Sequence, residues 1–331
     1  MSALLAMLIG LASALGAEQV TYGAARSSGR LDFSGVTSRD QAMGNASAAA
    51  GRGPSVFLVN PSLLAGQDAA YSLDQNLNLF FSRSLISASH VFKGYTGAAA
   101  LGYADFGSLN GFDFDGTPYS VRPYQASLDL GAGKHLDAGF KAGLAAHSLI
   151  QSFGKFGAKS AFGASGGLNW ERNGWNLAYS HDLESDLDRA ANTILSSMKI
   201  GAAWSSGWLE SQRLTLASQL DYDFGFSRIA RVGIENFSFG ILALRAGYEA
   251  PLGQEFGLPS WTTGLGVQYG EWQIDLCYAG RDALGATQRA SLTWRPEIGT
   301  KKEPMAEAAP VQALPQTKPV PSMKVPKGKQ K

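Results

Sequence analysis

The sequence predicts an all-β protein: a transmembrane antiparallel β-barrel of about 14 strands, with an N-terminal hatch (plug) inside it and a disordered C-terminal tail. Three observations lead to this prediction. From about residue 69 to 297, apolar residues alternate with polar or small ones in successive segments. The segments are longer than strands of soluble sheets and match the 9–11 residues or so of a tilted bilayer-crossing strand. Only 17% of the residues are charged, where about 25% is usual.

The N-terminal part precedes the alternating pattern and divides in two. Residues 1–16 form an apolar run that ends in small residues, which is typical of a signal peptide. No Lys or Arg precedes the run, so a buried N-terminal helix is the alternative. Residues 17–68 are the predicted hatch, because a barrel of fourteen strands is wider than side chains alone can fill.

The barrel prediction depends on the two faces of each strand. In EWQIDLCYAG, for example, Trp272, Ile274 and Leu276 share one face, while Gln273 and Asp275 share the other. In a membrane barrel the apolar face points outward, and tryptophans near segment ends form interfacial girdles. A soluble exported β-sandwich, whose apolar face meets a second sheet, is the alternative.

Residues 69–297 divide into fourteen such segments, an even number as in bacterial barrels, with twelve or sixteen as alternatives. The predicted strands are 69–82, 84–92, 95–106, 120–134, 136–150, 157–171, 174–183, 195–206, 212–225, 228–238, 239–251, 260–270, 271–280 and 285–297.

The connections and the tail suggest an orientation. The long connections 108–120 and 183–193 should face outside, and short ones such as 171–174 should face the periplasm of a Gram-negative-type bacterium. Residues 298–331 are rich in Pro and Lys and contain no aromatic residue, so we expect a disordered periplasmic tail. A formal net charge of +1 gives no reason to expect a nucleic-acid partner.

Charged residues on the predicted inward faces gather on the later strands. Opposite charges on neighbouring strands can pair across the sheet and bind the hatch, whereas an unpaired charge in a confined lumen is costly. We interpret them as a network between wall and plug, with a selectivity or substrate contact as the alternative. The network comprises Arg52 from the hatch and Asp221, Asp223, Arg231, Glu235, Arg245, Glu249, Asp275, Arg289 and Arg295 from the strands.

The sequence offers no catalytic or metal site. His90, His135, His147 and His181 are scattered singly, without the short spacings of metal ligands. Asp137 and His147 would share one inward face, but they would lie about 33 Å apart at roughly 3.3 Å per residue. We therefore expect a protein that is not an enzyme and that has no metal or cofactor.

The segment 43–65, MGNASAAAGRGPSVFLVNPSLLA, resembles the N-terminal signature of the FadL-type outer-membrane family, and more closely its PorV/PorQ branch. In that signature a Met-Gly stretch leads through small residues to an Asn-Pro motif before the first strand. Here the matching residues are Met43, Gly44, Asn60, Pro61 and Leu64. The sequence departs from the pattern with Ser62-Leu63 in place of Ala-Gly.

The resemblance implies an outer-membrane barrel closed by a hatch. PorV/PorQ-type members are partners in type IX-like protein export, so the first hypothesis is an export or surface-display partner that contacts membrane lipid and exported proteins or secretion components. A FadL-type transporter of hydrophobic small molecules is the alternative. The motif at 60–65 is common to both, but the short chain favours the first because FadL-type transporters usually carry longer outer loops.

Overall fold

The computed structural model describes eight stretches of the chain: residues 37–77, 82–112, 116–185, 194–209, 211–223, 228–252, 259–280 and 287–296. The predicted signal peptide 1–16, the first part of the predicted hatch and the tail 298–331 lie outside the described residues. In the described part no helix is long and apolar enough to cross a membrane.

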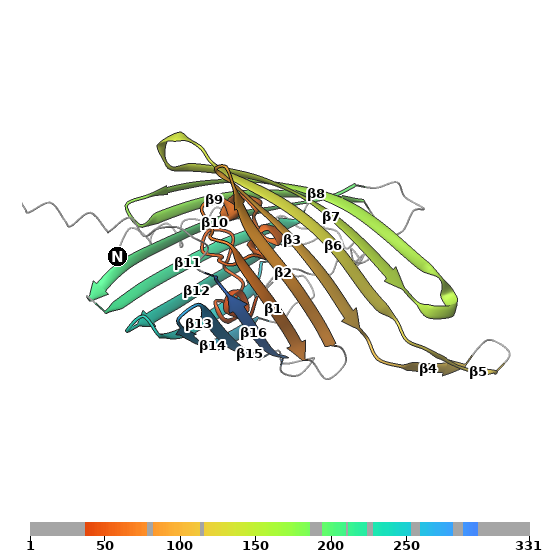
Figure 1. Cartoon of the computed structure of the whole chain (residues 1–331). Helices are drawn as coiled ribbons and strands as arrows, with labels where there is room; N and C mark the ends of the chain where they lie inside the picture. Colours follow the sequence, from red (N-terminus) through yellow and green to blue (C-terminus); the bar gives the residue numbers. More distant parts are fainter. Residues whose placement is uncertain are drawn as a thin grey trace, which may run out of the picture. The chain divides into compact units, whose positions relative to one another are not determined.

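Fourteen antiparallel strands form a closed barrel, as predicted (Figure 1). Each strand pairs with the next barrel strand along the chain, and β1 pairs with β16 to close the cylinder. The barrel strands are β1 (Ala70–Leu77), β2 (Ser82–Phe92), β3 (Tyr95–Asp105), β6 (Tyr124–His135), β7 (Phe140–Ser152), β8 (Ala158–Arg172), β9 (Trp175–Ser185), β10 (Ile194–Leu209), β11 (Gln212–Asp223), β12 (Arg228–Ser238), β13 (Leu242–Pro251), β14 (Ser260–Tyr269), β15 (Trp272–Gly280) and β16 (Thr287–Trp294).

Two local features differ from the predicted elements. The connection 108–120 contains a hairpin of its own, β4 (Leu109–Phe112) paired with β5 (Pro118–Val121), which extends beyond the barrel at the right of Figure 1. The predicted strand 136–150 begins later, because Asp137–Gly139 form a 3-10 turn in which Ala138 has a positive φ. Asp137 therefore lies in a turn between β6 and β7, outside any strand.

The two faces of the wall have opposite polarity. Large apolar side chains point outward into the surroundings, among them Leu144, Phe162 and Leu101, which are 72%, 66% and 57% exposed. Polar side chains such as Asp129 and Ser180 are fully buried on the inner face. This apolar-out, polar-in order is that of a membrane barrel and the reverse of a soluble sandwich.

Residues 37–69, here called the inner segment, lie within the barrel (Figure 1). The segment contains helix α2 (Ser38–Ala42) and two 3-10 turns, η1 (Val56–Leu58) and η2 (Pro61–Leu64). Thr37 caps α2 because its hydroxyl accepts a hydrogen bond from the Asp40 N–H, and Asn60 caps η2 in the same way through Ser62. Helix α2 packs against β13 to β16, whereas η2 packs against β6 to β8.

Candidate functional site in the barrel interior

The Asn-Pro motif lies on a row of glycines in the wall. Gly133, Gly143 and Gly167 are direct register partners on β6, β7 and β8. A Cβ atom at Gly143 would meet the Pro61 carbonyl oxygen, and one at Gly167 would meet the Asn60 side chain. Glycine is therefore required here, since the backbone of the inner segment approaches the backbone of the wall directly.

Hydrogen bonds fix the motif on this row. The Asn60 side chain is fully buried, and its Nδ2 donates to the Ala48 carbonyl oxygen at 2.9 Å. Its Oδ1 accepts from the Ser62 N–H at 3.1 Å. On the next strand, the Ser180 hydroxyl donates to the Val59 carbonyl oxygen at 3.0 Å. The motif thus ties two parts of the inner segment to each other and to the wall.

The Met-Gly motif uses the same arrangement on the other side of the barrel. Gly233 and Gly247 are register partners on β12 and β13, and a Cβ atom on either would collide with the backbone of Met43 or Gly44. The Gly44 N–H donates to Thr262 Oγ1 at 3.0 Å on the neighbouring strand β14. Both sequence motifs therefore mark places where the inner segment contacts glycine backbone.

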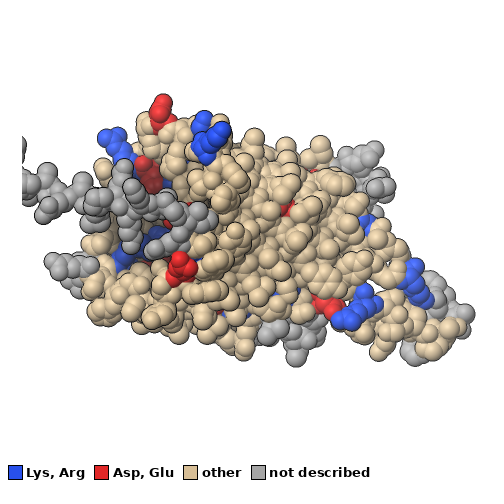
Figure 2. Space-filling model, viewed as in Figure 1, with Lys and Arg blue, Asp and Glu red and all other residues tan. Residues whose placement is uncertain are grey.

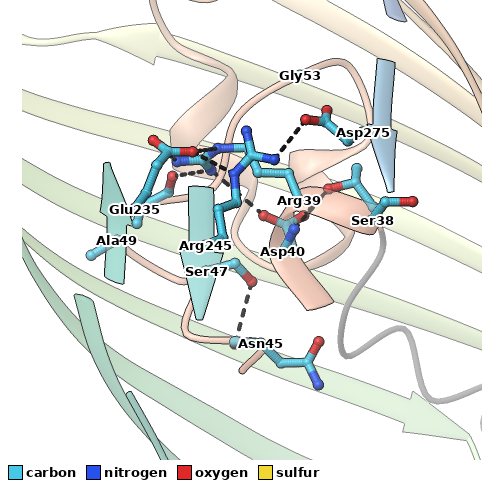
Figure 3. A network of polar contacts seen from close by, with 12 residues as sticks. Ser38, Arg39, Asp40, Asn45, Ser47, Ala49, Gly53, Glu235, Arg245 and Asp275 are labelled. Atoms are coloured by element: carbon cyan, nitrogen blue, oxygen red, sulfur yellow. Dashed lines mark hydrogen bonds and ion pairs between the residues drawn. The ribbon is translucent and has the colours of Figure 1, made fainter. Parts of the chain in front are cut away.

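Four buried ionic side chains connect α2 with the wall, and we call them the latch network (Figure 3). Arg39 binds Glu235 through two hydrogen bonds, Nε to Oε2 at 2.8 Å and Nη2 to Oε1 at 3.0 Å. Arg245 donates to Glu235 at 2.7 Å and to Asp275 at 2.7 Å. Glu235 is 2% exposed, so its charge depends on these two guanidinium groups.

A second network involves other residues that the sequence singled out. Arg231 forms ion pairs with Glu249, at 2.9 Å, and with Asp221. Asn45 of the inner segment donates to Glu249 at 3.0 Å. Of the other predicted members, Asp223 ends β11, Arg289 is buried on β16, and Arg295 follows β16 and donates to Gln273 at 2.8 Å.

The arginine of the inner segment that forms hydrogen bonds with Glu235 is Arg39, whereas Arg52, which the sequence suggested, interacts with Glu235 through its charge. Arg39 is buried in α2 and reaches Glu235, whereas Arg52 forms no ion pair with a described residue. The short stretch TSRDQA could have indicated this, because Thr37 followed by Asp40 is an N-cap pattern that places Arg39 on a helical turn next to Met43.

Sequence reasoning also missed a polar chain across β6, β7 and β8. His147 Nδ1 lies 3.0 Å from Asp129 Oδ1, and its Nε2 lies 2.9 Å from Ser165 Oγ. The order is that of a hydrolase triad, but Ser165 sits in mid-strand with its backbone in the ladders to β7 and β9. Its N–H is thus not presented as an oxyanion donor, and the three groups join adjacent strands.

The outward wall behind the Met-Gly motif contains an apolar groove of about 440 Å³. Its floor includes Gly233 and Gly247, whose inner side touches the inner segment. Its sides are formed mainly by Trp175, Trp204, Leu216, Val232, Ile234 and Tyr248. An aromatic and aliphatic lining of this size suits a small hydrophobic molecule.

No family model matches the sequence, and no curated protein matches it. Among solved structures, the Pseudomonas putida toluene transporter TodX matches with a TM-score of 0.58 at 11% identity, over 81% of this chain and 100% of that chain. The monoaromatic hydrocarbon channel CymD matches with a TM-score of 0.55 at 12% identity, over 81% of this chain and 100% of that chain. The chain has the fold of these two proteins.

Proposed function

We propose that this chain is a non-enzymatic outer-membrane barrel that passes hydrophobic small molecules, with the inner segment acting as its hatch. The observation that carries the proposal is the closed barrel with an apolar outer wall, built around a segment fixed by the latch network. This chain has the same fold as the TodX and CymD channels, and this likeness favours transport over protein export as its function. The groove behind Met43 and Gly44 adds an apolar surface beside the proposed hatch.

Uptake by cells that express the chain tests the proposal. We expect such cells to accumulate radiolabelled toluene faster than cells that express a barrel of unrelated function. Equal rates in the two strains would refute transport of this class of molecule.

A reversible cross-link tests the role of the inner segment. A Cβ atom at Gly201 would lie 3.0 Å from the Ala48 Cβ, so a disulfide in the double variant Ala48→Cys/Gly201→Cys needs an adjustment of about 0.5–1 Å. If the segment must move for passage, oxidation slows uptake and a reductant restores it, while Gly201→Cys alone does not respond. Equal uptake in both redox states would refute movement at this contact.

Export of proteins is the second candidate, and the observation that favours it is the PorV/PorQ-like spacing of Met43-Gly44 and Asn60-Pro61. Under this hypothesis the partners are exported proteins or secretion components. Purification from native membranes in mild detergent should then recover components of the secretion machinery. Recovery of the barrel without them, together with toluene uptake, would favour transport alone.

A further inference from the structure

Arg213 and Arg295 lie near one end of the barrel, and Arg52 is close enough to both for the positive charges to interact. This end, which we call the short-turn end, carries the two- or three-residue connections 93–94, 173–174, 239–241 and 270–271. Arg213 is the second residue of β11 next to this end, and Arg295 directly follows β16. Arg52 comes from the inner segment. Figure 2 shows basic side chains in the recess at the left-hand end of the barrel.

These three guanidinium groups differ in their partners from Arg39, Arg231 and Arg245. Arg39, Arg231 and Arg245 bind carboxylates, whereas Arg52, Arg213 and Arg295 form no ion pair within the described part of the chain. The Arg295 Nη1 donates at 2.8 Å to the neutral amide of Gln273. The Arg213 guanidinium lies 5.3 Å from the centre of the Phe237 ring, and its buried Nε has no acceptor among the described residues.

The electrostatics of the cluster call for a counter-charge. Burial, together with the positive charges of Arg39, Arg213 and Arg295, lowers the pKa of Arg52 to about 9, and Glu235 opposes this only in part. All three side chains are half-buried, so a solute can reach them. An anion at this place would relieve the repulsion and supply an acceptor for Arg213 Nε.

We propose that Arg52, Arg213 and Arg295 form a binding site for a phosphate group at the short-turn end. Phosphate offers several acceptor oxygens and up to two negative charges, and guanidinium groups bind it through paired N–H donors. Because Arg52 belongs to the inner segment and the other two to the wall, the bound group bridges segment and barrel. The phosphate comes either from free inorganic phosphate or from an anionic lipid headgroup at that membrane surface.

Binding is measured on the purified full-length chain in detergent, by titration calorimetry with inorganic phosphate at constant ionic strength. Each of the variants Arg52→Gln, Arg213→Gln and Arg295→Gln is expected to weaken binding about tenfold or more, because each removes a charge-assisted hydrogen bond. Arg172→Gln is the matched control, since Arg172 lies exposed at the same end and should bind phosphate like the wild type.

Heat-modifiable gel mobility shows whether each variant is folded. The variant Arg295→Lys keeps the positive charge but loses the guanidinium fork, so it should bind phosphate with intermediate affinity. Short-chain phosphatidic acid then identifies the source of the phosphate. If it competes with inorganic phosphate, the site binds a lipid headgroup; if it does not compete, the site binds the free ion. The proposal is overturned if neither probe binds the wild type, or if the folded Gln variants bind as the wild type does. Neither binding measurement depends on uptake, so the phosphate-site proposal can hold even if the transport proposal fails.

Discussion

Replacing Glu235 with Gln is expected to destabilise the folded barrel more than any exposed charge removal. In the wild type the Glu235 carboxylate accepts hydrogen bonds from Arg39 at 2.8 and 3.0 Å and from Arg245 at 2.7 Å, and it is 2% exposed. A neutral amide cannot balance two buried guanidinium groups. Breaking a buried pair in this way costs about 3–5 kcal/mol.

The assay is reversible urea unfolding in lipid vesicles, followed by tryptophan fluorescence. The matched control is Glu171→Gln, which removes a surface ion pair with Lys141; Glu171 is 52% exposed, and such pairs contribute about 0.2–1 kcal/mol. The double variant Arg39→Gln/Glu235→Gln should recover part of the loss, with a coupling free energy of about 1–3 kcal/mol. Equal destabilisation by Glu235→Gln and Glu171→Gln would refute the role of the latch network.

Three further substitutions test other parts of the structure by the same unfolding assay. Gly143→Ala should cost about 1–3 kcal/mol, because the new methyl group meets the Pro61 carbonyl, whereas Gly207→Ala, with open space around it, should not be destabilised in this way; similar losses at both sites would contradict the close contact. Leu101→Arg, in the middle of β3 and 57% exposed, should cost about 2–4 kcal/mol in a bilayer and less in the Leu101→Ala control; an equal effect would argue against a lipid-facing wall. Burial raises the pKa of Asp40, only partly opposed by Arg39, so the wild type loses stability as pH rises from the unfolded pKa of about 3.9 to the raised folded value. The variant Asp40→Asn lacks this loss, so its free energy of unfolding relative to that of the wild type should increase over that pH range. If the difference in unfolding free energy between the two proteins stays constant with pH, Asp40 titrates normally.

Most of the barrel could be predicted because period-two alternation is a local property of the sequence. The predicted strand 212–225 and β11, Gln212–Asp223, agree closely, and Ile274 and Asp275 lie on the predicted outer and inner faces. The start of β7 was misplaced because a turn with a positive φ at Ala138 has no strong signal in its sequence.

The interior could be predicted only as a set of residue types, since partners there are fixed by the register of distant strands. Glu235 and Arg245 are direct register partners, but Arg39 reaches Glu235 from a position 196 residues away in sequence. The glycines at 133, 143 and 167 look ordinary one by one. Their role appears only when the register aligns them under Pro61 and Asn60.

The position of the inner segment imposes an order on biogenesis. This segment is synthesised before any strand of the barrel, yet the Ser38 N–H bonds to Ser291 in β16, the last strand to be made. Helix α2 also packs on β13 to β15, while η2 packs on β6 to β8. The inner segment therefore remains without its native neighbours until β16 has been synthesised and the barrel has closed.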